Sequence, residues 1–262
     1  MKKSGLFIFY PMTKYLLFIL LFPILVFSQN INPKKEKIFQ DIVTSLQTPN
    51  EVTNLNLRAN NLFEVPIEIQ KLKNLKHLNL MKNNIEFWSE TNTNFQKLEV
   101  LLFNENELKQ IPNSIDLCQN LLKIDLSANK LNKLPDNFTK LKKIKHLTLS
   151  VNNISILPEE FGDCKNIEVI EIDNNQLSFL PATISKLKKL IFLDISYNQF
   201  YELDENWFHF PKLKHLNLDY NKLTTIPSEI YYLKKLEILQ INFNNLKELP
   251  ESIVNLENLN TL

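Results

Sequence analysis

The chain has 262 residues, of which 44% are hydrophobic and 23% are charged, the balance of a folded globular protein. Its formal net charge of +1 indicates neither a basic surface for nucleic acid nor an acidic tail. Because it has only two glycines, it cannot contain the glycine-rich loops that hold phosphates in P-loop and dinucleotide-binding folds.

The first 28 residues have the layout of an export signal. Three lysines precede an apolar run over residues 15–27, and Val26 and Ser28 suit the positions before a cleavage site. We therefore predict that residues 1–28 are a signal peptide cleaved before Gln29, which places the protein outside the cell or in the cell envelope. The apolar run is shorter than the roughly 20 residues of a spanning helix. The alternative is an uncleaved N-terminal membrane anchor.

Residues 29–51 connect this signal to a region of internal repeats. Asn32 followed by Pro33 is a favourable helix start, and the apolar residues after it keep helical spacing. These residues are Ile38, Phe39, Ile42, Val43 and Leu46. We expect a helix and a turn that together cap the repeats, because the end of a repeat array exposes an apolar cross-section.

From Val52 onward the sequence repeats every 23 residues without insertion or deletion. The nine copies over 52–258 start at Val52, Leu75, Leu98, Leu121, Ile144, Ile167, Leu190, Leu213 and Leu236. Their shared pattern is LxxLxLxxNxLxxLPxxIxxLxx. The last two leucines of LxxLxL lie two residues apart and so face one side of a short strand, which stacking joins into a parallel sheet over an apolar core.

The ninth position of every copy is asparagine, where the chain turns inward after the strand. A buried amide at such a turn can donate to and accept from the backbone of neighbouring repeats. We therefore predict a ladder of stacked amides along the solenoid. Its members are Asn60, Asn83, Asn106, Asn129, Asn152, Asn175, Asn198, Asn221 and Asn244.

The fifteenth position is proline in seven copies and predicts a turn into a short helical segment on the opposite, convex side. Two repeats depart from this pattern, since the second has Trp88 and Ser89, and the seventh has Leu203 and Asp204, in place of the leucine and proline. We expect less regular convex segments there. Trp88 and Trp207 are interpreted as core or edge packing.

Residues 259–262 begin a tenth copy that reaches its second apolar position at Leu262. No capping segment follows them in the sequence, although the end of a repeat array offers free backbone groups and apolar side chains. We expect either a truncated member of a longer family or an edge that another subunit covers. In both cases the final repeats should fray first.

The repeated pattern over residues 52–262 resembles the leucine-rich-repeat family in its 23-residue LPxxIxxL variant. The resemblance implies an α/β repeat solenoid, a right-handed horseshoe with a parallel concave sheet and short helical or 3-10 segments on the convex side. The opening SLQTPNEVTNLNL is similar to secreted leucine-rich-repeat proteins of bacterial pathogens such as leptospires, which are regarded as interaction modules.

Neither histidines nor cysteines form a pattern that supports chemistry. His77, His146 and His215 share one column but lie three repeats apart, about 14 Å, too far to bind one metal ion. Cys118 and Cys164 lie two repeats apart, about 10 Å, beyond the reach of a disulfide, and so are expected to be small buried hydrophobic residues. We expect no catalytic residues, no cofactor and no metal, and therefore no enzyme.

The exposed positions beside the strands on the concave face are candidates for binding. Aromatic residues adjoin acidic ones in repeats six to nine, which is how protein-binding hot spots are composed. The candidate partner-binding residues are Glu171, Asp173, Phe192, Asp194, Tyr197, Asp219, Tyr220, Ile238 and Phe243. The alternative is that the aromatic column shields the turn beside the asparagine ladder and contacts nothing else.

The sequence thus predicts an exported protein that binds a protein ligand, or a glycan, on its concave face, with a host protein as one possible partner. We expect the protein to bind no nucleic acid and to contact a membrane only through its N-terminal signal segment. Self-association through the uncapped C-terminal edge is a further possibility. The alternatives are a membrane- or envelope-associated scaffold, and the repeat part of a larger effector whose enzymatic domain is absent from this chain.

Overall fold

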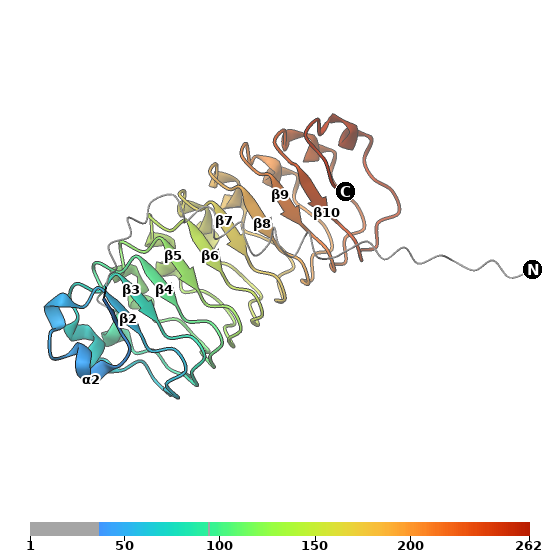
Figure 1. The fold of residues 1–262 in the computed structure, drawn as a ribbon. Helices are drawn as coiled ribbons and strands as arrows, with labels where there is room; N and C mark the ends of the chain where they lie inside the picture. Colours follow the sequence, from blue (N-terminus) through green and yellow to red (C-terminus); the bar gives the residue numbers. More distant parts are fainter. Residues whose placement is uncertain (1–36, 94) are drawn as a thin grey trace, which may run out of the picture. The chain divides into compact units, whose positions relative to one another are not determined.

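The computed structural model describes residues 37–93 and 95–262 (Figure 1). The predicted signal peptide and the helix start at Asn32 and Pro33 lie outside these residues. Lys37–Leu262 forms one compact unit. Within the described part of the chain, no helix is both long and apolar enough to cross a membrane.

One parallel sheet runs through the unit, with its ten strands in chain order (Figure 1). The strands are β1 (Ile38–Phe39), β2 (Asn54–Asn56), β3 (His77–Asn79), β4 (Val100–Leu102), β5 (Lys123–Asp125), β6 (His146–Thr148), β7 (Val169–Glu171), β8 (Phe192–Asp194), β9 (His215–Asn217) and β10 (Ile238–Gln240). From β2 to β10 the register pairs residues 23 apart, as Leu147 with Ile170. The predicted repeat register and parallel solenoid are confirmed.

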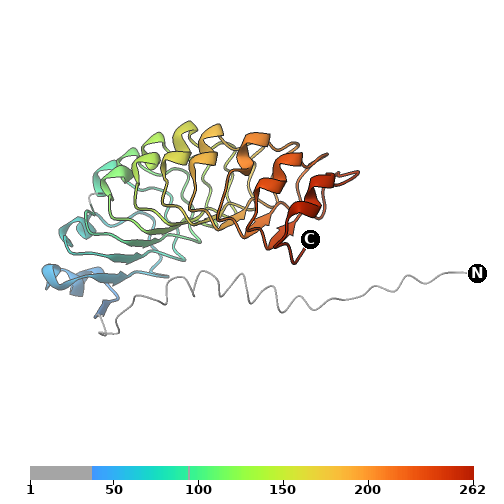
Figure 2. The same cartoon turned by 90° about the horizontal axis from the view of Figure 1, so that it is seen from above.

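Short 3-10 helices lie on the side of the repeats away from the strands (Figure 2). They are η1 (Pro49–Glu51), η2 (Ile67–Lys71), η3 (Glu90–Asn92), η4 (Asn113–Leu117), η5 (Asp136–Lys140), η6 (Glu159–Asp163), η7 (Ala182–Lys186), η8 (Glu205–Phe208), η9 (Ser228–Tyr232) and η10 (Glu251–Asn255). In seven of them a proline immediately precedes the first helical residue, where its fixed φ and missing donor cost nothing. The predicted convex segments therefore form.

The two repeats without this proline have the shorter helices η3 and η8, as expected. A side-chain cap stands at the proline position: Ser89 accepts from Thr91 N, and Asp204 accepts from Asn206 N at 2.8 Å. Trp88 and Trp207 are buried, so both belong to the core, as interpreted from the sequence. The change from proline to a capping side chain accounts for the less regular geometry.

The core is a continuous column of the repeated leucine, isoleucine and phenylalanine side chains. Cys118 and Cys164 are buried in it as free thiols, as predicted. Burial raises the pKa of each thiol to about 12, so both stay protonated and unreactive near neutral pH. The repeated positions are thus committed to packing.

The segment before the first repeat differs from the expected capping helix. Ile38 and Phe39 form the edge strand β1, which pairs with β2, and only α2 (Ile42–Ser45) is helical. A strand turns successive side chains to opposite faces, so Phe39 is buried while Ile38 is exposed. Val43 is also exposed. The expected single helical face from Ile38 to Leu46 is therefore wrong.

At the other end, a tenth copy of the strand position begins. Thr261 pairs with Ile238 in parallel register, and Leu239 N donates to Thr261 O at 3.0 Å. Thr261 holds the same place in its repeat as Ile238 does in the ninth. The stacking geometry therefore continues unchanged to the last residues of the chain.

Candidate functional site

The asparagine ladder fixes the turn that follows each strand. The Asn152 side chain is an example: its Nδ2 donates to Leu126 O and Leu149 O at 3.0 Å, and its Oδ1 accepts from Leu131 N at 2.9 Å. Each amide therefore joins its own turn to the preceding repeat. The same arrangement recurs at Asn83, Asn106, Asn129, Asn175, Asn198, Asn221 and Asn244.

Asn60 differs from the other predicted ladder members because the segment before it is not a full repeat. It is exposed, and the one described residue to which its Nδ2 donates is Arg58, whose O lies 3.3 Å away. Its backbone N–H donates to Asn83 Oδ1 at 2.9 Å. The ladder of side chains thus begins at Asn83.

The residue just before each ladder asparagine has a left-handed backbone. All nine copies have φ between 50 and 57°: Ala59, Lys82, Glu105, Ala128, Val151, Asn174, Tyr197, Tyr220 and Phe243. None is glycine, so each carries the steric penalty of that region. The conformation is imposed by the turn and lines up these side chains in one row at the edge of the sheet.

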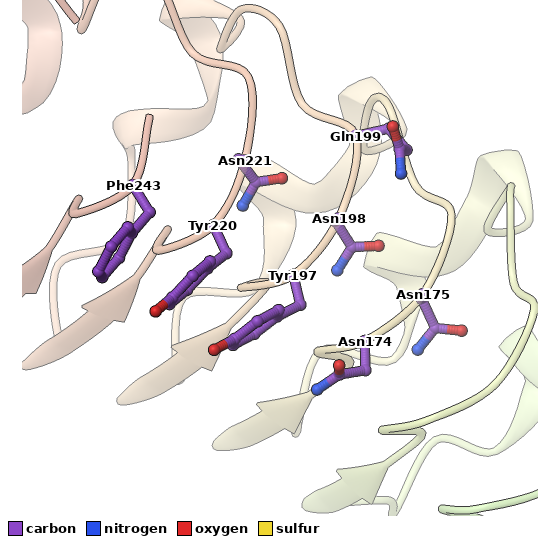
Figure 3. A pocket seen from close by; sticks show the side chains of 8 residues that line it. All are labelled: Asn174, Asn175, Tyr197, Asn198, Gln199, Tyr220, Asn221 and Phe243. Carbon is purple, nitrogen blue, oxygen red and sulfur yellow. The ribbon is translucent and has the colours of Figure 1, made fainter. Parts of the chain in front are cut away.

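In the last three repeats this row is a stack of aromatic rings, which we call the aromatic ridge: Tyr197, Tyr220 and Phe243 (Figure 3). Both neighbouring pairs have ring centroids 4.1 Å apart, with interplanar angles of 11° and 14°. A hydrogen bond to the Tyr220 hydroxyl is the main reason that the pKa of Tyr197 is raised. Although stacked, the three side chains remain 46%, 38% and 68% exposed.

A shallow groove of about 490 Å³ runs along one side of the aromatic ridge. The amides of Asn174 and Gln199 and three asparagines of the ladder complete its lining (Figure 3). Asn174 and Gln199 are not among the partner-binding residues predicted from the sequence. The signal for Asn174 was its place in the same column as Tyr197, whereas Gln199 follows the ladder position and carried no aromatic or charged signal.

On the sheet side of the aromatic ridge lie four partly buried carboxylates: Glu171, Asp173, Asp194 and Asp219. Each accepts hydrogen bonds from neutral groups. Glu171 accepts from Thr148 Oγ1 at 2.9 Å, Asp173 from Ser150 Oγ and from Asn174 Nδ2, Asp194 from Ser196 N and Asn217 Nδ2, and Asp219 from Asn242 N. None forms an ion pair with a residue that the structure describes.

Burial makes three of these carboxylates harder to ionise. It raises the pKa of Asp194 to about 6, against hydrogen bonds from Ser196 and Asn217 that lower it, and the nearby charge of Asp173 adds to the rise. Burial likewise raises the pKa values of Glu171 and Asp219. A neighbouring cation would stabilise all of them in the charged form.

Two of the predicted partner-binding residues are less accessible than expected. Phe192 is only 5% exposed, because its ring packs against that of His215 at 4.6 Å. Ile238 is partly covered and pairs with Thr261. Large side chains at the third position of neighbouring repeats cover one another across the strands. The alternating sequence pattern predicts that this position faces outward, but it does not predict how much its neighbours cover it. The structure thus places the accessible surface at the aromatic ridge and the carboxylates.

Two of the three histidines in the column pack inside the protein. His146 and His215 are buried, and burial lowers the pKa of His146 to about 4 and also lowers that of His215. His215 Nε2 contacts Gln240 Oε1 at 2.8 Å. Both rings are therefore neutral at pH 7. Among the described residues, no group of histidine, cysteine, aspartate or glutamate side chains is arranged to hold a metal ion.

Comparison with known proteins gives one family and several solved structures with a similar fold. The family model described as leucine rich repeat matches residues 119–177, 189–246 and 211–262, which together make up just over half of the chain, and it indicates no catalytic family. No curated protein matches the chain by sequence.

Among solved structures, a leucine-rich-repeat protein of Leptospira interrogans is 34% identical with a TM-score of 0.79, covering 86% of this chain and 58% of that one. The resemblance to a leptospire protein expected from the sequence is therefore confirmed, although this chain spans less than two thirds of its length. The leucine-rich-repeat domain of the type III effector XopL is 25% identical, with a TM-score of 0.70 over 85% of this chain and 79% of that one. The plant peptide hormone receptor RGFR1, solved in complex with RGF2, is 27% identical, with a TM-score of 0.72 over 86% and 38%.

Proposed function

Since this chain belongs to the leucine-rich-repeat family, whose fold commonly serves protein–protein interaction, we propose that it is an exported protein that binds a protein partner at the aromatic ridge. The observation that carries the proposal is the ridge itself. Three adjacent aromatic side chains stay exposed on a rigid row of turns. Rigid aromatic side chains supply a large contact area at a low entropic cost, which is why they dominate hot spots.

The solved relatives support a protein or peptide partner more than a glycan. RGFR1 was solved with RGF2, and the Arabidopsis receptor kinase HAESA with the peptide hormone IDA. Their shared fold supports binding as a use of this architecture. The partner of the present chain is proposed from its own exposed residues.

Site-specific photocrosslinking in the full chain tests this proposal. A photoreactive phenylalanine replaces Phe243 in one variant and Glu105 in the control, since both lie in the same column of the sheet edge and are exposed. We expect a discrete crosslinked protein from position 243 in extracts of the envelope or of a host, and none from position 105. The further change Tyr220→Ala should abolish the crosslink while circular dichroism stays unchanged. Equal crosslinking from both positions would contradict a site at the ridge.

Export is a separate part of the proposal and rests on the sequence of residues 1–28. Cleavage before Gln29 would release the protein, whereas an intact apolar segment would support the envelope-scaffold alternative. Mass spectrometry of the N-terminus of the exported protein distinguishes the two. Recovery of the intact N-terminus in the membrane fraction would exclude release and leave binding at the ridge as an independent question.

A further inference from the structure

The exposed face of the sheet divides its charges unevenly. In repeats one to four, the third, fifth, seventh and eighth positions carry Arg58, Lys82 and Lys123 together with Glu105 and Asp125. Among the described residues of repeats six to nine, the same positions include four carboxylates and no lysine or arginine. The buried His215 adds no positive charge at neutral pH, because desolvation lowers its pKa. The half of the face that carries the aromatic ridge is therefore negative.

No ion pair between described residues neutralises this negative charge. Asp194 accepts from the backbone N–H and hydroxyl of Ser196 at 2.9 and 2.6 Å, and Asp219 accepts from Asn242 N at 2.6 Å. These donors are neutral, so they hold the carboxylates in place without cancelling their negative charge. Like charges gathered at a partly buried surface repel one another, and a cation from outside removes that cost.

The carboxylates and the aromatic ridge form one surface. Glu171 pairs with Asp194 across β7 and β8, and the charge of Asp173 acts on Asp194. Asp219 lies close enough to Tyr197 for its charge to affect the tyrosine hydroxyl. A side chain with an apolar stem and a cationic head, such as that of lysine or arginine, fits this arrangement, because it can lie along ring edges while its head reaches a carboxylate.

We propose that the aromatic ridge and the four carboxylates bind a polypeptide segment in which lysine or arginine alternates with apolar residues. This inference rests on the proposed binding function and names the chemistry of the partner. Glu171 and Asp219 lie two repeats apart, about 10 Å along the sheet at the usual strand spacing. In an extended segment, side chains two residues apart point the same way and start about 7 Å from each other. The long flexible stems of two basic residues separated by one apolar residue cover the remaining distance, so their charged heads reach both ends of the cluster.

Binding of short synthetic peptides to the full chain, measured by calorimetry, tests the proposal. The peptides alternate leucine with lysine, with glutamine or with glutamate. We expect the lysine peptide to bind, with an affinity that falls as ionic strength rises. Asp194→Asn and Asp219→Asn should each weaken it about fivefold, the upper range for a partly exposed ion pair. Tyr220→Ala should weaken it as well.

Asp125→Asn is the matched control. Asp125 occupies the same column as Asp194 and accepts from Ser127 N at 3.0 Å and Ser127 Oγ at 2.7 Å, but it lies three repeats away from Asp194. We expect it to change lysine-peptide affinity by less than about twofold. An equal effect of Asp125→Asn and Asp194→Asn would mean diffuse attraction and would overturn the proposal.

Three further outcomes would also overturn it. If the glutamine or glutamate peptide binds as tightly as the lysine peptide and Tyr220→Ala weakens that binding, the ridge binds peptides without needing a cation, and the proposed function survives. If no peptide binds, the named chemistry is wrong, while photocrosslinking at position 243 still decides the proposed function. If sedimentation shows that the chain alone dimerises and Tyr220→Ala prevents this, the occupant is a second copy.

Discussion

The two halves of the solenoid share one backbone and differ in what they place on it. Lys82 and Glu105 follow the strands of repeats two and three, with φ values of 55 and 56°, and form an ion pair at 3.3 Å. Tyr220 and Phe243, at the same position of repeats eight and nine, have φ values of 52 and 55° and form an exposed stack. Side chains of different kinds therefore adopt the same backbone conformation in this column, and the aromatic ridge is not needed to build the turn.

The interior, in contrast to the exposed face, is the same in both halves. Asn129 and Asn198, three repeats apart, make equivalent hydrogen bonds to their own turn and to the preceding repeat. The buried residues that the solenoid needs for folding are thus repeated in every copy. The residues that differ between the halves are exposed, so a partner can reach them. The following changes test whether the two halves are alike inside and different outside.

The largest effect is expected at the junction of the two halves. Gly162, in η6 of repeat five, lies against repeat six so closely that a Cβ atom would stand 1.7 Å from Thr183 O. Because a backbone carbonyl cannot move aside without shifting η7, we expect Gly162→Ala to cost about 3 kcal/mol. Chemical denaturation followed by circular dichroism measures the loss, and a broadened transition would show that the halves have become less coupled. Ala182→Gly, at the first residue of η7, is a nearby control; equal effects of the two changes would contradict this account.

The next largest effect should be the same in both halves. Asn129→Ala and Asn198→Ala each leave one buried N–H, that of Leu108 or Leu177, without its partner, and each removes one of the two hydrogen bonds that buried carbonyl oxygens such as Phe103 O and Ile172 O accept. We expect a loss of about 2 to 3 kcal/mol for each variant in chemical denaturation.

Asn60→Ala is the matched control for these variants, because the Asn60 side chain is exposed and, among the described residues, donates only to Arg58 O. It should cost less than about 0.5 kcal/mol. A large difference between Asn129→Ala and Asn198→Ala would show that the interiors of the two halves are not equivalent, and the comparison would fail at its first step.

The architecture could be predicted from the sequence because each repeated residue type has one physical role. Leucine spacing fixed the strand register, asparagine the ladder, and proline the start of the 3-10 helices. The prediction failed where the repeat stops constraining the chain. Between Ile38 and Leu46 the apolar spacing also suits a strand followed by one helical turn, and pairing of β1 with the open edge of β2 satisfies backbone groups that a helix would leave exposed.

The candidate surface was only partly predictable. The column of Tyr197, Tyr220 and Phe243 follows from the repeat length alone, and the structure brings the rings into contact. Burial of Phe192 depends on the size of its neighbours across the sheet, which no periodicity encodes. Whether the ridge and the carboxylates bind a partner is a matter of chemistry outside the chain, and it stays a prediction.

A smaller effect should distinguish the outer faces of the halves. The pKa of Asp194 is raised to about 6 by burial, so the folded protein holds this proton more tightly than the unfolded chain, whose value is 3.8. Its contribution to stability is therefore complete below about pH 4 and is lost as the pH rises through 6. A pKa shift of this size corresponds to about 3 kcal/mol of unfolding free energy. Asp194 is partly exposed, and Asp194→Asn also alters the hydrogen bond from Asn217. We therefore expect the variant to be more stable than wild type by only about 1 to 2 kcal/mol at pH 7.

Denaturation of this variant and of wild type at pH 4, 5, 6 and 7 measures the effect. The gain should disappear near pH 4, where the wild-type carboxyl is protonated. Asp125→Asn, which keeps the equivalent bonds from Ser127 in the other half, should stay within about 0.5 kcal/mol of wild type. If Asp194→Asn both stabilises the free protein and weakens binding of the lysine peptide, then this carboxylate lowers stability and is needed for binding. A destabilising Asp194→Asn at pH 7 would instead mean that its hydrogen bonds outweigh its buried charge.

The smallest effect concerns the backbone that both halves share. Val151 has φ of 57° in the row of turns, and a β-branched side chain is the least suited to that region. Asn174 occupies the next turn with φ of 52°, and asparagine tolerates this conformation. We expect Val151→Asn to stabilise the protein by about 0.5 to 1 kcal/mol, raising the melting temperature by about 2 °C. Val151→Thr, polar but still β-branched, should give no gain, and Asn174→Val should lose a similar amount. If Val151→Thr stabilises as much as Val151→Asn, the benefit comes from removing an exposed apolar side chain, and the row of turns carries no strain that its residues must tolerate.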